Sequence, residues 1–117
     1  MEVEIELGEF DTGLYSGYEF NQSEGRAWLT IHVDEVGNKT IEFEGVRYHQ
    51  FTELYACSFE MVDAYFKLVN LGQTQQLVNY LKIIESRCDS ARDVTHFRIF
   101  LDESGCFDIY ASSASSA

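Results

Sequence analysis

The chain has 117 residues, of which 45% are hydrophobic and 15% aromatic, so it carries enough apolar material for one domain with a substantial core. Its formal net charge of −12 argues against binding to nucleic acid or anionic membranes, and it favours partners with basic surfaces. Seven of the 20 acidic residues lie in the first 25 positions, where no Lys or Arg occurs.

The N-terminal residues form the first predicted strand. Glu2, Glu4 and Glu6 alternate with three aliphatic residues, which is typical of a half-buried strand with a charged outer face. This acidic start differs from the basic, then apolar, start of a signal peptide. No apolar run approaches the ~20 residues that cross a bilayer.

The cysteines bear on the compartment. Cys57, Cys88 and Cys106 are odd in number and widely spaced, with no CxxC motif. Such usage is typical of reduced thiols rather than of a secreted disulfide framework. We therefore expect a cytoplasmic protein.

The next part of the chain contains the clearest strand signals. Residues 8–25 are aromatic, acidic and rich in glycine, and we expect a short strand near 14–20 within an otherwise irregular stretch. Residues 26–34 and 39–44 alternate clearly and predict two strands joined by a turn. After Gly45 the alternation changes phase, which predicts a β-bulge or a tight turn into another strand.

From Thr52 onward the hydrophobic period becomes helical. Apolar residues recur at i, i+3 and i+4 up to Gly72, and Ser58 is suited to cap the start of this helix. A second helix is predicted from Thr74 to about Cys88. Because the link between them is so short, the two helices are expected to form an antiparallel hairpin.

Two strands, at 96–102 and 106–111, close the predicted domain, which spans residues 1–111, and residues 112–117 are expected to be a frayed tail. Because strands occur in runs, we predict an α+β fold: a mostly antiparallel twisted sheet of five to seven strands, with the two-helix hairpin packed on one face. The predicted core comprises Leu29, Ile31, Val33, Ile41, Phe43, Met61, Tyr65, Leu68, Leu77, Leu81, Ile84, Phe97, Ile99, Phe107 and Ile109.

Two segments resemble parts of small uncharacterised bacterial proteins. The first runs from Asp63 to Val69 and continues with Gly72 and Leu77, and the second is the pair of strands over 96–109. Together they cover roughly the second half of the chain. The resemblance implies a single-domain α+β protein and, in some of these proteins, an immunity-like role as the partner of a toxin. Its motifs contain no catalytic residue, so it implies no site.

Polar residues on the predicted sheet suggest one candidate ligand site. His32, His96, Glu42 and Asp108 all point away from the apolar side if the alternation holds, and neighbouring strands would bring some of them together. Histidine with carboxylate is a ligand set for zinc or iron, but no HxH, HExxH or CxxC spacing occurs, so we expect no metal and no cofactor.

A catalytic cysteine is also considered. Cys57 precedes a predicted helix start, where a thiol is more acidic, but its apolar neighbours favour an inert buried thiol. No catalytic residue is assigned.

The acidic N-terminal region suggests a contact surface. Carboxylates would steer a basic partner and aromatic rings would anchor it; the predicted surface comprises Glu2, Glu4, Glu6, Asp11, Tyr15, Tyr18 and Trp28. The opposing interpretation is a solubilising charge beside a packed loop.

The leading hypothesis from the sequence is a non-enzymatic acidic binding protein, of the immunity or inhibitor type, that covers a basic surface of a protein partner. The alternative is a small-molecule binding domain or minor enzyme, with a pocket at the helix–sheet junction or on the polar sheet face near His32 and His96. Self-association through an exposed aromatic face is a third hypothesis.

Overall fold

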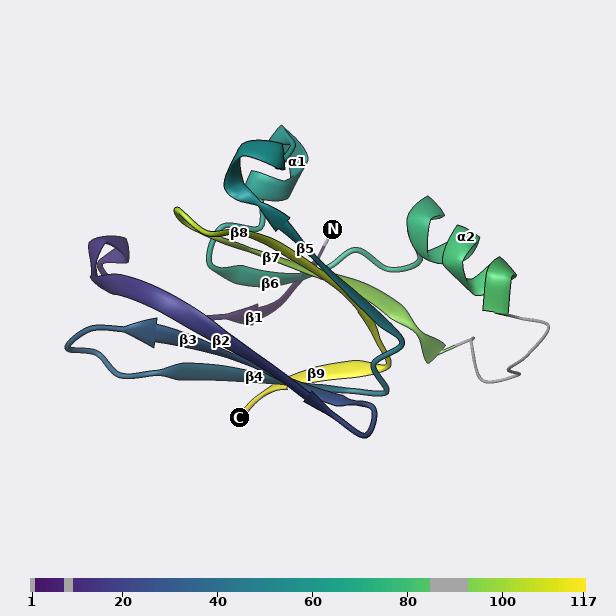
Figure 1. The fold of residues 1–117 in the computed structure, drawn as a ribbon, viewed down its shortest axis with the longest axis horizontal. Coiled ribbons are helices and arrows are strands. Elements are labelled where there is room, and N and C mark those ends of the chain that lie inside the picture. The colour runs from purple at the N-terminus through teal and green to yellow at the C-terminus, as the bar shows by residue number, and fades with distance from the viewer. Residues whose placement is uncertain (1, 8–9, 85–92) are drawn as a thin grey trace.

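The computed structural model describes residues 2–7, 10–84 and 93–117, and it shows two β-sheets packed face to face. One sheet has five strands in the order β1-β6-β7-β8-β5, and the other has four in the order β2-β3-β4-β9. Neighbouring strands are antiparallel in both sheets. Figure 1 shows the sheets as two layers, with both helices on the outer side of the five-stranded sheet.

The five-stranded sheet combines strands that are far apart in the sequence. Its strands are β1 (Glu2–Glu6), β5 (Tyr48–Glu53), β6 (Lys67–Asn70), β7 (Thr95–Leu101) and β8 (Gly105–Ala111). The other sheet contains β2 (Tyr15–Ser23), β3 (Arg26–Val33), β4 (Lys39–Glu44) and β9 (Ser113–Ser116). Two 3-10 turns, η1 (Thr12–Leu14) and η2 (Leu54–Ala56), and two helices, α1 (Phe59–Val62) and α2 (Gln75–Ile84), complete the described elements. Strand β2 is longer than the short strand expected near 14–20.

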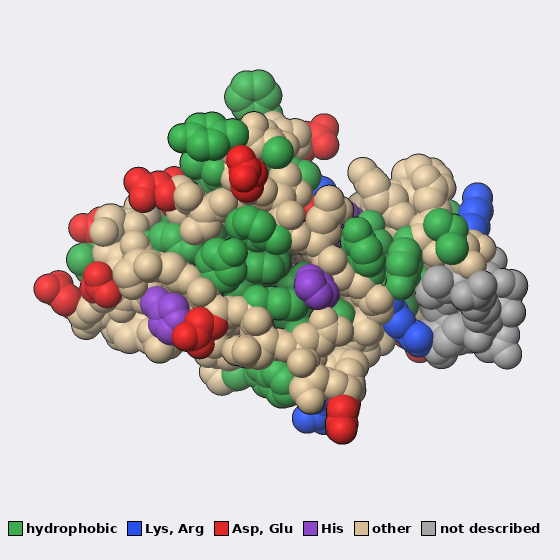
Figure 2. Space-filling view, in the orientation of Figure 1, with side chains coloured by type: hydrophobic (Ala, Val, Ile, Leu, Met, Phe, Trp, Pro, Cys, Tyr) green, Lys and Arg blue, Asp and Glu red, His purple; other side chains and the backbone are tan. Residues whose placement is uncertain are grey.

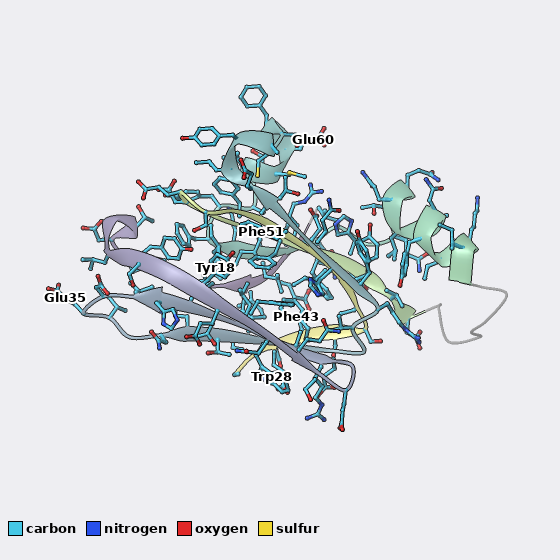
Figure 3. All side chains as sticks on the ribbon, viewed as in Figure 1. Tyr18, Trp28, Glu35, Phe43, Phe51 and Glu60 are labelled. Carbon is cyan, nitrogen blue, oxygen red and sulfur yellow. The ribbon has the colours of Figure 1, made fainter. Side chains whose placement is uncertain are left out.

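The main core lies between the two sheets because each strand turns its alternate apolar residues inward. Figure 3 shows Phe43 between the two layers. Most of the predicted core is confirmed in this cluster: Leu29, Ile31, Val33, Ile41, Phe43, Leu68, Phe97, Ile99, Phe107 and Ile109. Each such large apolar side chain contributes roughly 1.5–3 kcal/mol when it is fully buried.

The predicted fold class, one sheet with a helical hairpin on it, is wrong, and the error begins in the first predicted helix. Only α1, with four residues, is helical there, and residues 67–70 form β6 between β1 and β7. Leu68 faces the core between the sheets, while Val69 packs in a second cluster on the outer face. A strand buried on both faces loses its alternation, so its apolar run imitated a helical stripe.

This error also displaced part of the predicted core. Met61 is only half-buried, and Tyr65 is exposed, because α1 has only four residues and ends at Val62, so no long helix covers the sheet there. Leu77 and Leu81 are buried as predicted, although they belong to a separate small cluster with Val94 and Tyr110. The side chain of Ile84 lies outside the described residues.

The second predicted helix is confirmed as far as Ile84. Helix α2 begins after Thr74, whose hydroxyl oxygen accepts a hydrogen bond from the Leu77 backbone N–H at 3.2 Å. This is the bond that a helix-capping threonine makes. The remainder of the prediction, to about Cys88, lies outside the described residues.

The chain crosses between the sheets at two adjacent points. Gly45, with φ of 63°, turns the chain from β4 into β5, which confirms the predicted turn. Ser112 separates β8 from β9, and its N–H donates to the Glu44 carbonyl at 2.9 Å. A Cβ atom at Gly45 would collide with the Ser112 side chain, so glycine suits both the conformation and the space. The predicted frayed tail is wrong, because residues 113–116 pair with β4.

Candidate functional site

A buried polar cluster lies on the outer face of the five-stranded sheet, next to the start of α2. It consists of Thr74, His96, Arg98 and Asp108, and we call it the His96 cluster. His96 is 2% exposed and Asp108 is 7% exposed. His96 Nε2 lies 2.6 Å from Asp108 Oδ1, and Arg98 Nε donates to the same oxygen at 2.7 Å. Thr74 Oγ1 lies 2.8 Å from His96 Nδ1.

The cluster is electrostatically balanced. Burial by itself raises the pKa of Asp108, but the hydrogen bonds from His96 and Arg98, together with the Arg98 charge, hold that pKa below its usual value. Asp108 is therefore ionised near neutral pH and faces a fixed positive charge. Every buried side-chain nitrogen and oxygen in the described part of the chain has a hydrogen-bond partner. The buried charge in this cluster is therefore both paired and hydrogen-bonded, which offsets the cost of removing it from water.

Thr74 connects this cluster to α2. In the tautomer with the proton on Nε2, His96 donates a hydrogen bond from Nε2 to Asp108 and accepts one at Nδ1 from the Thr74 hydroxyl. The order hydroxyl, imidazole, carboxylate is that of hydrolase triads. Here the same hydroxyl also caps α2, and Arg98 neutralises the carboxylate, so the arrangement fastens the first turn of the helix to the sheet.

The two described thiols are not activated. Burial raises the pKa of the Cys106 thiol far above its usual value, and the nearby Asp108 charge raises it further. Burial also raises the pKa of Cys57, whose Sγ donates to the Thr52 and Glu53 carbonyls at 3.4 Å. A nucleophilic cysteine needs the opposite shift. Cys88 lies outside the described residues.

The structure divides the ligand site predicted from the sequence between two sheets. His96 and Asp108 meet on the five-stranded sheet, whereas His32 and Glu42 lie on the outer face of the four-stranded sheet. His32 lies 2.9 Å from the Asn38 amide oxygen and 3.6 Å from Glu19, and Glu42 lies 3.8 Å from Arg26. Within the described residues, no group of three or more His, Cys, Asp or Glu side chains is arranged to hold a metal ion.

A second feature of the outer face is an exposed aromatic segment at residues 53–63, which contains η2 and α1. Tyr55 is 93% exposed and Phe59 is 95% exposed. Leu54, Cys57 and Met61 of the same segment pack against the sheet and hold it in place. In Figure 2 hydrophobic and acidic side chains project together at the top of the molecule, where Figure 1 places α1.

The surroundings of this segment are acidic. Glu53, Glu60 and Asp63 are exposed within it, and Figure 3 shows Glu60 pointing away from the body of the molecule. A hollow of about 520 Å³ is lined by Glu53, Leu54, Tyr55, Glu103 and Ser104. Two carboxylates and a phenol ring in one hollow suit a Lys or Arg side chain, which both groups attract.

The predicted partner surface is not one continuous surface. Glu2, Glu4 and Glu6 are exposed on β1, at the edge of the five-stranded sheet, while Asp11 caps η1 by accepting from the Gly13 N–H.

The three predicted aromatic anchors lie apart from β1. Tyr15 and Tyr18 are half-buried against rings between the sheets, where they contact Phe66 and Phe107. Trp28 lies on β3 and points away from the core (Figure 3).

Sequence reasoning missed Tyr55 and Phe59. They follow Phe51 in an apolar run, which favoured burial, and a helix was expected there. One signal of exposure was present in the sequence: the acidic residues Glu53, Glu60 and Asp63 interrupt the apolar run.

No family model, curated protein or solved structure matches this chain. In the described part of the chain, no helix is long and apolar enough to cross a membrane.

Proposed function

We propose that this protein is a non-enzymatic acidic binding protein, of the immunity or inhibitor type, and that segment 53–63 with the Glu103 turn contacts a basic protein partner. The observation that carries the proposal is the hollow lined by Glu53, Tyr55 and Glu103, together with the exposed ring of Phe59 in the same segment. The proposal places the protein in the cytoplasm, where its thiols would stay reduced.

Exposure and charge support this function together. Large exposed rings are uncommon on a monomer and are enriched at interface hot spots. Tyr55 and Phe59 contribute little to the core, because their ring surfaces remain in solvent while their neighbours pack. The net charge of −12 adds long-range attraction for a basic surface, such as that of a nuclease, and accelerates association at low salt.

The proposal is tested by affinity capture from a lysate of the source organism, followed by titration of the purified captured protein. We expect a basic partner whose association rate falls steeply as salt rises. Phe59→Ala should weaken binding by at least roughly tenfold, as truncation of a hot-spot ring does. Glu103→Lys should weaken it as well, chiefly through slower association.

Matched variants separate this surface from the rest of the molecule. Ile83→Ala removes another side chain that is 75% exposed, from α2, and should leave affinity unchanged. Glu4→Lys makes the same charge change as Glu103→Lys, but on β1, so an equal effect would mean that only net charge matters. A partner whose affinity is insensitive to Phe59→Ala and to salt would overturn the proposal.

A second candidate function, a minor hydrolase at the helix–sheet junction, is favoured by the Thr74–His96–Asp108 hydrogen-bond order. It predicts hydrolysis of an activated ester such as p-nitrophenyl acetate above the solvent rate, abolished by His96→Ala and by Thr74→Val. Equal rates for these variants and the wild-type chain, all shown to be folded, would eliminate it.

A further inference from the structure

A second hollow, of about 340 Å³, lies where the end of β1, the turn η1 and the start of β6 meet. Among the described residues, none of segment 53–63 lines it. Its apolar wall consists of Leu7, Phe10, Tyr65 and Phe66. A cavity of this size, with an aromatic wall and a few polar groups, is the usual form of a small-ligand site.

The rings of this wall are held in place by contacts within the chain. Phe66 is 6% exposed, and its ring meets those of Phe10 and Tyr65 edge to face, with centroid distances of 5.3 Å and 4.8 Å. Lys39 Nζ lies 5.8 Å from the centroid of the Phe10 ring, where cation and ring attract each other. A wall that is ordered in advance lowers the entropic cost of binding a ligand.

The backbone is strained at Phe66. Its φ of 50° lies in the left-handed region, which a bulky residue rarely adopts. The bend is held by two backbone hydrogen bonds of 2.9 Å, from the Phe66 N–H to the Phe100 carbonyl and from the Phe100 N–H to the Ala64 carbonyl. Strained residues of this kind cluster at ligand sites, where the surrounding structure imposes the conformation. The strain therefore supports a binding role for the hollow that Phe66 lines.

Two opposite charges line the same hollow. Glu6 of β1 and Lys67 of β6 lie directly opposite each other in the register of the two strands, so their side chains share one face of the sheet. Neither of them forms an ion pair with another described residue. Thr12 adds a hydroxyl group to the lining. A ligand that carries both an ammonium and a carboxylate group can satisfy both charges at once.

We propose that this hollow binds a free α-amino acid with an aromatic side chain. The ligand ring packs against Phe10 and Tyr65. The ligand ammonium group pairs with Glu6, and the ligand carboxylate pairs with Lys67. Such a zwitterion has no net charge, so the charge of −12 on the protein does not repel it, as it would repel an aromatic acid that lacks the ammonium group.

The first test is calorimetric titration with L-phenylalanine. We expect saturable binding with a Kd between about 10 μM and 1 mM, as a ligand of this size allows. Three probes each lack one recognised group: 3-phenylpropanoate has no ammonium, 2-phenylethylamine has no carboxylate, and L-alanine has no ring. Each should bind at least roughly tenfold more weakly than L-phenylalanine. Absence of saturable binding of L-phenylalanine up to about 10 mM, or equal binding of all four compounds, would overturn the proposal.

Variants of the two charged residues test the location of the site. Lys67→Met and Glu6→Gln each remove one charge from the hollow and should weaken L-phenylalanine binding by roughly tenfold. Lys82→Met on α2 and Glu2→Gln on β1 remove the same charges from exposed positions outside the hollow and should have no effect. If the hollow variants bind as well as these controls, the proposal is wrong.

A further pair of variants separates blocking of the hollow from loss of the proposed function. Thr12→Phe adds a ring to the lining, so it should fill the hollow and abolish binding of L-phenylalanine. Unchanged binding to this variant, shown to be folded, would place the amino acid elsewhere. Phe59→Ala should leave the affinity for L-phenylalanine unchanged, so the outcome here is independent of the proposed protein partner.

Discussion

Two regions cover the outer face of the five-stranded sheet, helix α2 and segment 53–63, and they bury different kinds of side chain. Beside α2, charged and polar side chains are buried, with His96 2% exposed. In segment 53–63, two large rings are exposed, with Phe59 at 95%. The polar groups have partners within the chain, and the rings keep most of their surface in solvent. Buried polar groups with partners inside the chain contribute to stability, whereas exposed apolar rings contribute little to the fold and leave their surface accessible.

The largest expected effect is a loss of unfolding free energy when the His96 cluster is disrupted. Asp108→Ala removes the acceptor of both buried His96 and half-buried Arg98, and it leaves the Arg98 guanidinium without its counter-ion. Breaking a buried pair in this way typically costs roughly 3–5 kcal/mol of unfolding free energy. Urea denaturation measures this loss, with the exposed Glu4→Ala as control, expected to change stability by less than about 0.5 kcal/mol. Similar values for the two variants would contradict a stabilising role for the cluster.

A smaller effect is expected from pH. Because the folded-state pKa of Asp108 is lower than its unfolded value of about 3.9, its contribution is complete above that value and is lost as pH falls through the lowered pKa. Asp108→Asn lacks this titration. We therefore expect the stability difference between wild type and Asp108→Asn to be constant from pH 7 to about pH 5, and then to shrink in acid. A stability difference that grows as pH falls would show that folding raises the pKa of Asp108 instead of lowering it.

The smallest expected effect on stability is in the exposed segment. Phe59→Ala should change the unfolding free energy by less than about 0.5 kcal/mol, although it should impair partner binding. Phe43→Ala deletes a ring of the same kind from the core and should cost roughly 3–5 kcal/mol. Thermal or urea denaturation compares the two. If Phe59→Ala destabilised the fold as strongly as Phe43→Ala, segment 53–63 would have to be considered part of the core.

Strands whose residue types alternate were predictable from sequence. β3, β4, β7 and β8 all lie within a residue or two of their predicted bounds. β3 and β4 alternate between buried and more exposed positions, whereas β7 and β8 are buried on both faces but still place His96, Arg98 and Asp108 between apolar residues. β6 was not predictable, since Leu68 and Val69 are buried on opposite faces and remove the alternation.

The candidate site was predictable only in part. Alternation placed His96 and Asp108 on one polar face, and the structure joins them at 2.6 Å. The same reasoning grouped them with His32 and Glu42, because a strand pattern reports the face of a residue and not the sheet to which its strand belongs. The exposed rings of Tyr55 and Phe59 had no periodic signal, because exposure of a ring depends on what the rest of the chain covers.

The charge, the capacity for a single core, most of the strands and the inward face of each strand were readable from the sequence, because they follow from composition and from the two-residue period of a strand. Long-range packing divides the strands into two sheets and adds residues 67–70 and 113–116 to them as strands. Long-range packing also buries His96 and leaves Phe59 exposed. These outcomes depend on contacts between residues that are distant in the chain, and local patterns do not report such contacts.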